Sequence, residues 1–99
     1  ILERMDQFLY QCNDTYITVC SDVFSSAFAP GVSAPQSLGL DPEIVLPLIK
    51  HVLRTRKVRG FDICEISPRF DQDNTTANLG AVIIFAVVNT LCRLNGLSI

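Results

Sequence analysis

The 99-residue chain is 48% hydrophobic and 18% charged, which is enough apolar material for one small core but not for a large one. Its formal net charge of −2 gives no field that attracts a phosphate backbone, and the basic cluster at 54–59 carries little aromatic character, so we expect no nucleic acid partner. We expect no membrane partner, because the longest apolar run (79–88) is too short for a bilayer. We also expect a cytoplasmic location, because there is no secretory leader and without one the four cysteines, which also lack zinc-type spacing, do not imply disulfides.

The first elements along the chain are predicted to be a helix and a strand. Apolar residues recur at helical spacing over 2–11, and Asn13 and Asp14 break the pattern. The segment 15–20 is rich in β-branched and aromatic residues and is too short for a convincing helix, so it is predicted to be a strand covered on both faces. This strand ends at Ser21 and Asp22.

A long irregular loop is predicted over 25–40. Two prolines and two glycines among small residues cannot sustain a helix or a central strand. Loops of this length in compact domains are usually functional or disordered, and the apolar residues Phe28, Val32 and Leu38 favour a packed loop. The loop follows Asp22 directly, where a lid would lie.

The next segment predicts a helix and a second strand. Asp41 is suited to cap a helix that starts at Pro42, and apolar residues follow at helical spacing until 54–56, where cations suit the helix end. The segment 57–66 is predicted to be the second strand, also covered on both faces. A strand, a helix and a strand joined in this way indicate parallel strands.

A last helix is predicted after the polar segment 71–74, with Asn95 and Gly96 at its end. Its residues 79–91 are apolar on nearly every side, so we expect the helix to be buried. Two strands cannot form a complete sheet. The fold class is therefore predicted to be α/β, a three-layer α/β/α domain with a parallel sheet, of which residues 1–99 form a C-terminal, two-strand part of a single domain.

Acidic residues follow both predicted strands. Asp22 ends one apolar run and Glu65 ends the other, and each is followed by a loop that contains serine and proline. Because the carboxyl ends of parallel strands meet at one edge of a sheet, we expect both carboxylates in one crevice. Such a pair could hold a divalent cation, share acid and base chemistry, or bind an amidine or guanidine.

Two stretches of the chain resemble the ureohydrolase superfamily, which contains the arginases and agmatinases. These are Thr-Val-Cys-Ser-Asp-Val-Phe-Ser-Ser-Ala-Phe-Ala-Pro-Gly-Val-Ser-Ala-Pro at 18–35 and Gly-Phe-Asp-Ile-Cys-Glu-Ile-Ser-Pro at 60–68. In that family a strand ends in Asp-x-Asp before an Ala-Pro-Gly loop, and a later strand ends in Glu. The continuation Val-Ser-Ala-Pro at 32–35 is most similar to the formimidoylglutamase branch.

The resemblance implies a metal-dependent hydrolase. In the parent enzyme two Mn²⁺ ions would activate a hydroxide that attacks the carbon of a small amidine substrate, here N-formimidoyl-L-glutamate, as part of histidine degradation. Asp22 matches the second aspartate of the motif, a metal ligand, and Glu65 matches the catalytic, substrate-binding glutamate. Cys20 stands where the first aspartate belongs, and we assign it provisionally as a metal ligand although a thiol is softer than Mn²⁺ prefers.

Two alternatives stay open at this point. The first is hydrolysis of a guanidine, as in agmatinase or arginase. The second is a non-catalytic interaction module on the same scaffold, with its metal site lost through Cys20. The resemblance is also compatible with a homo-oligomer.

Overall fold

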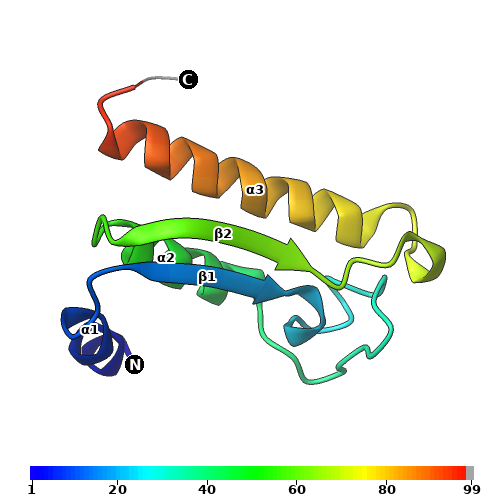
Figure 1. Cartoon of the computed structure of the whole chain (residues 1–99). Coiled ribbons are helices and arrows are strands. Elements are labelled where there is room, and N and C mark those ends of the chain that lie inside the picture. Colours follow the sequence, from blue (N-terminus) through cyan, green and yellow to red (C-terminus); the bar gives the residue numbers. More distant parts are fainter. Residues whose placement is uncertain (98–99) are drawn as a thin grey trace.

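The computed structural model describes residues 1–97 and has the predicted order of elements (Figure 1). Both predicted strands and all three predicted helices are present, with ends within a few residues of the expected positions. The helices are α1 (Leu2–Tyr10), α2 (Pro42–Leu53) and α3 (Thr75–Leu94), the strands are β1 (Thr15–Cys20) and β2 (Val58–Cys64), and the 3₁₀ turns are η1 (Ser21–Val23) and η2 (Pro68–Phe70).

The two strands are parallel, as predicted, and their register separates an apolar face from a polar one. Side chains alternate between the two faces of a strand, so paired residues share a face. On one face Ile17 pairs with Phe61 and Val19 with Ile63; on the other Tyr16 pairs with Gly60, Thr18 with Asp62 and Cys20 with Cys64.

Helices α2 and α3 pack against each other and against the apolar face of the sheet. Their buried side chains meet Val19 and the loop residues Phe24 and Ala29 in one cluster. The buried members contributed by the helices are Ile49, Leu53, Ile83 and Val87. Burial of side chains of this size stabilises the fold by about 1.5–3 kcal/mol each, and this cluster holds most of the buried hydrophobic residues, with Leu9 and Val32 buried outside it.

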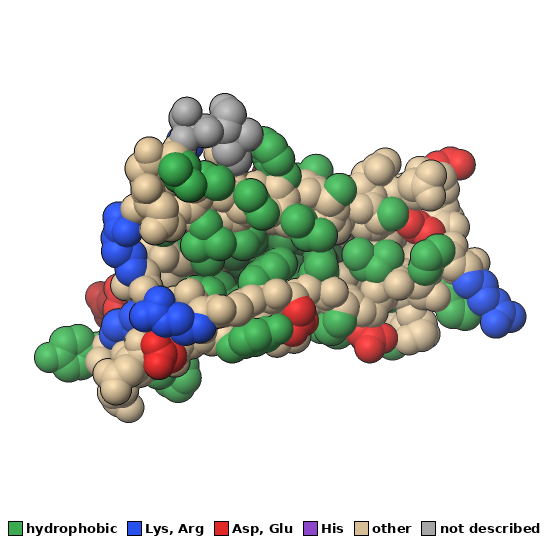
Figure 2. Space-filling view, turned by 45° about the horizontal axis from the view of Figure 1, so that its top comes forward, with side chains coloured by type: hydrophobic (Ala, Val, Ile, Leu, Met, Phe, Trp, Pro, Cys, Tyr) green, Lys and Arg blue, Asp and Glu red, His purple; other side chains and the backbone are tan. Residues whose placement is uncertain are grey.

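Helix α3 is buried on one side only, and the expectation that it is buried on nearly every side is wrong for the described residues. Ile83 is fully buried, but Val82, Phe85 and Val88 are about half exposed. Figure 2 shows the hydrophobic side chains gathered along α3 and in the hollow beside it. The helix contains 20 residues with a mean hydropathy of 1.7, a length and composition that would also cross a bilayer, but core helices share this profile and it decides nothing alone.

The polar face of the sheet is not covered by any helix in residues 1–97, so the predicted covering of both strand faces is wrong for this part of the chain. Tyr16 is 62% exposed and lies directly over Gly60, where a Cβ would come within 2.4 Å of its ring. The Thr18 hydroxyl donates to Asp62 at 3.3 Å. The hydrogen bond of the Tyr16 hydroxyl to the same carboxylate raises the pKa of Tyr16.

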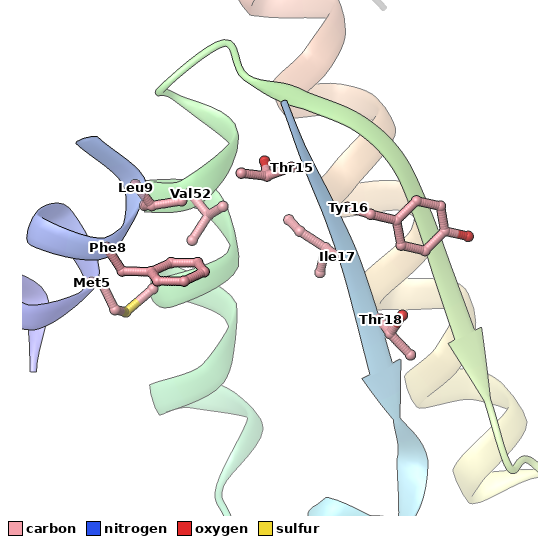
Figure 3. A pocket seen from close by; sticks show the side chains of 8 residues that line it. All are labelled: Met5, Phe8, Leu9, Thr15, Tyr16, Ile17, Thr18 and Val52. Atoms are coloured by element: carbon pink, nitrogen blue, oxygen red, sulfur yellow. The ribbon is translucent and has the colours of Figure 1, made fainter. Parts of the chain in front are cut away.

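Helix α1 borders the outer edge of β1 and leaves a groove of about 300 Å³ (Figure 3). Met5, Phe8 and Val52 face Ile17 across it. Two polar contacts attach α1 to the rest of the chain. Asp6 pairs with His51 of α2 at 2.6 Å, and the Lys57 ammonium donates to the Leu9 carbonyl at 2.6 Å. His51 is therefore a partly buried residue that ties α1 to α2.

The loop between η1 and α2 is packed, but only partly by the residues expected. Val32 is buried as predicted, whereas Phe28 is 40% exposed and Leu38 fully exposed, so the prediction is wrong for those two. Phe24 and Ala29 take their place in the core. Two short bridges, Phe24 with Leu40 and Ser25 with Gln36, hold the two ends of the loop together.

Candidate functional site at the carboxyl edge of the sheet

The two strands end side by side, and both predicted carboxylates follow them. Cys20 and Cys64 are the last register partners. After Cys20 the chain turns into η1, which carries Asp22, and after Cys64 comes Glu65. Both acidic residues therefore lie at the same edge of the sheet, as predicted.

Cys20 and Asp22 are in direct contact. The Cys20 thiol donates to Asp22 Oδ1 over 2.7 Å. This hydrogen bond to the carboxylate, with a smaller effect of burial, raises the pKa of Cys20 to about 11. A thiol with this pKa is protonated at neutral pH, so Cys20 is a poor nucleophile in the metal-free protein.

Glu65 is exposed and has an unusual backbone conformation. Its φ of +67° lies in the left-handed region, which costs an ordinary residue of the order of 1–3 kcal/mol and persists only where neighbouring contacts impose it. The two residues after it supply such contacts. Ile66 packs against Gly80 of α3, where a Cβ would come within 2.6 Å of Ile66 Cδ1, and the Ser67 N–H donates to the Gly31 carbonyl at 2.7 Å.

The Ala29-Pro30-Gly31 loop joins this strand end to α3. The Gly31 N–H donates to the Thr76 hydroxyl at 2.7 Å, and the Gly31 carbonyl accepts the bond from Ser67. Gly31 lies so close to Asp71 that a Cβ would be 2.7 Å from its Cβ. The sequence placed this loop near the site but gave no sign that Thr76 holds it, because the two residues are 45 positions apart.

Asp71 caps the start of α3, as the sequence indicated. Its carboxylate accepts from the backbone N–H groups of Gln72, Thr76 and Ala77 at 2.9–3.0 Å. Burial acts to raise the pKa of Asp71, but the bonds from Thr76, Ala77 and Gln72 outweigh it and lower the pKa below its usual range. Asp73 has a φ of +51° and makes no comparable bonds among residues 1–97.

Residues 1–97 do not form a metal site by themselves. They contain no group of three or more His, Cys, Asp and Glu side chains placed to hold an ion. Asp22 supplies an oxygen donor of the kind that Mn²⁺ prefers, whereas the sulfur of Cys20, bonded to the same carboxylate, is a softer donor. Asp22 therefore fits the predicted metal better than Cys20 does, and the assignment of Cys20 as a metal ligand stays a prediction.

A parallel α/β sheet with polar side chains on the loops after its strands is the arrangement in which open α/β proteins bind small molecules. The sequence profile of the arginase family matches residues 1–89. The chain belongs to the arginase family, which confirms the resemblance seen in the sequence.

Similar curated relatives include two formimidoylglutamases. The chain is 60% identical over all 99 residues to formimidoylglutamase of Clostridium tetani and spans 29% of that protein. It is 43% identical over 86 residues, 87% of the chain, to formimidoylglutamase of Legionella pneumophila, of which it spans 27%. The chain thus spans less than a third of the length of these relatives.

Solved structures confirm the arginase-like α/β fold. The agmatine ureohydrolase of Thermoplasma volcanium superposes with a TM-score of 0.82 at 28% identity, over 95% of this chain and 31% of that one. The formimidoylglutamase of Bacillus subtilis gives a TM-score of 0.85 at 24% identity, over 92% of this chain and 28% of that one. At the latter identity the likeness concerns the fold alone.

Proposed function

We propose that the chain contributes to a formimidoylglutamase, an enzyme that uses water to cleave N-formimidoyl-L-glutamate into L-glutamate and formamide in histidine degradation. The observation that carries the proposal is the 60% identity, over the whole chain, with a relative of that name. We further propose that residues 1–99 are a C-terminal part of one ureohydrolase-like domain, in the cytoplasm, whose remaining site residues come from elsewhere in the domain.

We propose that Glu65 binds the formimidoyl group in this reaction. A protonated formimidoyl group is a planar cation with N–H donors, and a carboxylate accepts from such a group with two parallel hydrogen bonds. Glu65 is exposed at the end of β2, and it makes no ion pair within the described residues. It is therefore free to bind and orient the cationic end of the substrate, which is the role predicted for it from the sequence.

Asp22 is the candidate metal ligand of this segment. A divalent ion such as Mn²⁺, two per site in the sequence-based prediction, would supply an activated hydroxide. The described residues bring together fewer than three ligand side chains, which is too few to hold two catalytic metal ions. Among them, Asp22 is the residue that supports the metal. Elemental analysis of the purified full-length polypeptide tests this part of the proposal directly.

The experiment that tests the function is a parallel assay of the full-length polypeptide that carries these residues. The protein is supplied with Mn²⁺, its metal content is verified, and formimidoylglutamate, agmatine and arginine are offered separately. Formamide from the first substrate alone is the expected result. Urea from either of the others would replace the proposal with guanidine hydrolysis, and no product from any substrate would favour a non-catalytic scaffold. The isolated 99 residues, tested beside it, should be inactive.

A further inference from the structure

A network of short hydrogen bonds connects Thr76, at the start of α3, to Ser67, which follows Glu65 in the loop after β2. Gly31 lies at its centre: its N–H donates to the Thr76 hydroxyl and its carbonyl accepts from the Ser67 N–H, both at 2.7 Å. Gly31 and Thr76 are buried, and Thr76 is only 1% exposed. Because the peptide groups on both sides of the Gly31 Cα are hydrogen-bonded, Gly31 cannot move without weakening one of the two bonds.

Asp71 fixes the hydroxyl on which this network depends. Its carboxylate accepts from the Thr76 N–H at 2.9 Å and from the Ala77 N–H at 3.0 Å, so the first turn of α3 is held in one place. The Thr76 hydroxyl, carried on this turn, is thereby placed to accept the Gly31 N–H. Gly31 in turn lies against Asp71 with no space for a side chain.

The other end of the network reaches Glu65. Ser67 is two residues beyond it, and the intervening Ile66 is packed against Gly80 of the same helix α3. These contacts are the restraints that immediately follow the left-handed backbone of Glu65. Without them the chain would relax toward an ordinary conformation and carry the carboxylate to a different position.

We infer that Thr76, held by Asp71, is a positioning residue that acts through Gly31 and Ser67 to fix the carboxylate of Glu65. The role given to Glu65 rests on the proposed function; the hydrogen-bonded connection does not. Thr76 itself touches no substrate. A residue that only caps a helix would affect kcat/KM whether or not Glu65 is present, whereas the effect of Thr76 should depend on the Glu65 carboxylate.

The test compares Thr76→Val, which keeps the shape but removes the hydroxyl, with Thr76→Ser, which keeps the hydroxyl, in the full-length polypeptide. We expect Thr76→Val to lower kcat/KM for formimidoylglutamate roughly 10- to 100-fold, as displacement of a binding group by about 1 Å does. Thr76→Ser should stay within about threefold of the unmodified protein, because the hydroxyl on which the network depends is retained. Unchanged activity of Thr76→Val would overturn the inference.

A double-mutant cycle separates positioning from simple stabilisation. Once Glu65→Gln has removed the carboxylate, adding Thr76→Val should cause little further loss of kcat/KM, because both changes act on one group. Losses that multiply would show that Thr76 acts independently of Glu65 and would overturn the inference.

Hydrogen exchange gives a readout that does not need activity. Exchange at the Gly31 and Ser67 amides should accelerate in Thr76→Val and not in Thr76→Ser. If Thr76→Val does not fold, Asp71→Asn, which keeps one accepting oxygen, is measured in its place. If the unmodified protein is inactive but exchange is faster in Thr76→Val, the proposed function is refuted and the link from Thr76 through Gly31 to Ser67 is supported. If exchange is unchanged in Thr76→Val, this link is refuted whatever the activity.

Discussion

Replacement of Gly31 by alanine should displace the loop that meets the candidate site. The added Cβ would lie 2.7 Å from Asp71 Cβ and Cγ and 2.8 Å from its Cα, and such contacts are not tolerated. Relief to ordinary contact needs a shift of about 0.8 Å, which would stretch the 2.7 Å bonds to Thr76 and Ser67 beyond useful length. Overpacking costs about 1–3 kcal/mol and each weakened bond about 0.5–1.5 kcal/mol.

These costs overlap, because one movement relieves the contact and breaks the bonds. The alanine also makes the unfolded chain less flexible, which stabilises the fold by about 0.4–1 kcal/mol. With this gain subtracted, the expected loss of unfolding free energy is about 2–4 kcal/mol. In a protein of the relatives' size, roughly 340 residues, this lowers Tm by roughly 3–6 °C. Differential scanning calorimetry of the full-length polypeptide measures it, with Ser33→Ala as the control in an exposed part of the same loop. A Tm for Gly31→Ala equal to that of the control would refute the steric argument.

Three further predictions concern the titrating groups and the metal. In the metal-free protein, Asp22→Asn should lower the pKa of Cys20 from about 11 toward its usual 9.0. Alkylation of this thiol at pH 8, followed by peptide-resolved mass spectrometry, should then be up to about 100-fold faster. An unchanged rate would contradict the role of the hydrogen bond. Asp71, whose folded-state pKa is lowered, contributes stability that is present above about pH 4 and is lost as the pH falls through that folded-state value. The Tm difference between the unmodified protein and Asp71→Asn should therefore shrink on acidification, and a constant difference between pH 7 and pH 3 would show that Asp71 does not titrate in this way. Calorimetric titration of the isolated 99 residues should find Mn²⁺ binding weaker than micromolar, because too few donors converge, and tighter binding would contradict the description of the site.

Local patterns predicted the elements because each depends on neighbouring residues. The β-branched run at 15–20 and the Asp41-Pro42 start of α2 needed no distant information, and the parallel pairing followed from the connection between them. The predictions for Phe28 and Leu38 failed because apolar character alone does not determine which side chains of an irregular loop turn inward. The burial of α3 was overestimated because its outer side has no neighbour in residues 1–97.

The candidate site was predictable in part. The position of Asp22 and Glu65 at one edge could be predicted because strand ends are visible in the sequence and parallel strands end at one edge, whereas their roles stay predictions. The contact between Cys20 and Asp22 was not foreseen as a hydrogen bond, and it explains why Cys20 is a protonated thiol. The role of Thr76 could not be read from the sequence, because its partner lies 45 residues away and its geometry exists only once α3 has packed.

The two unlike faces of the sheet also protect the strand pairing against error. A slip of β2 by one residue would direct Asp62 toward α2 and α3 and turn Phe61 or Ile63 out to water, since successive side chains point to opposite faces. An ionised carboxylate inside the aliphatic cluster would cost far more than the pairing could return. The short pair of strands thus has one acceptable alignment, and with it the positions of both strand ends are decided before any ligand arrives.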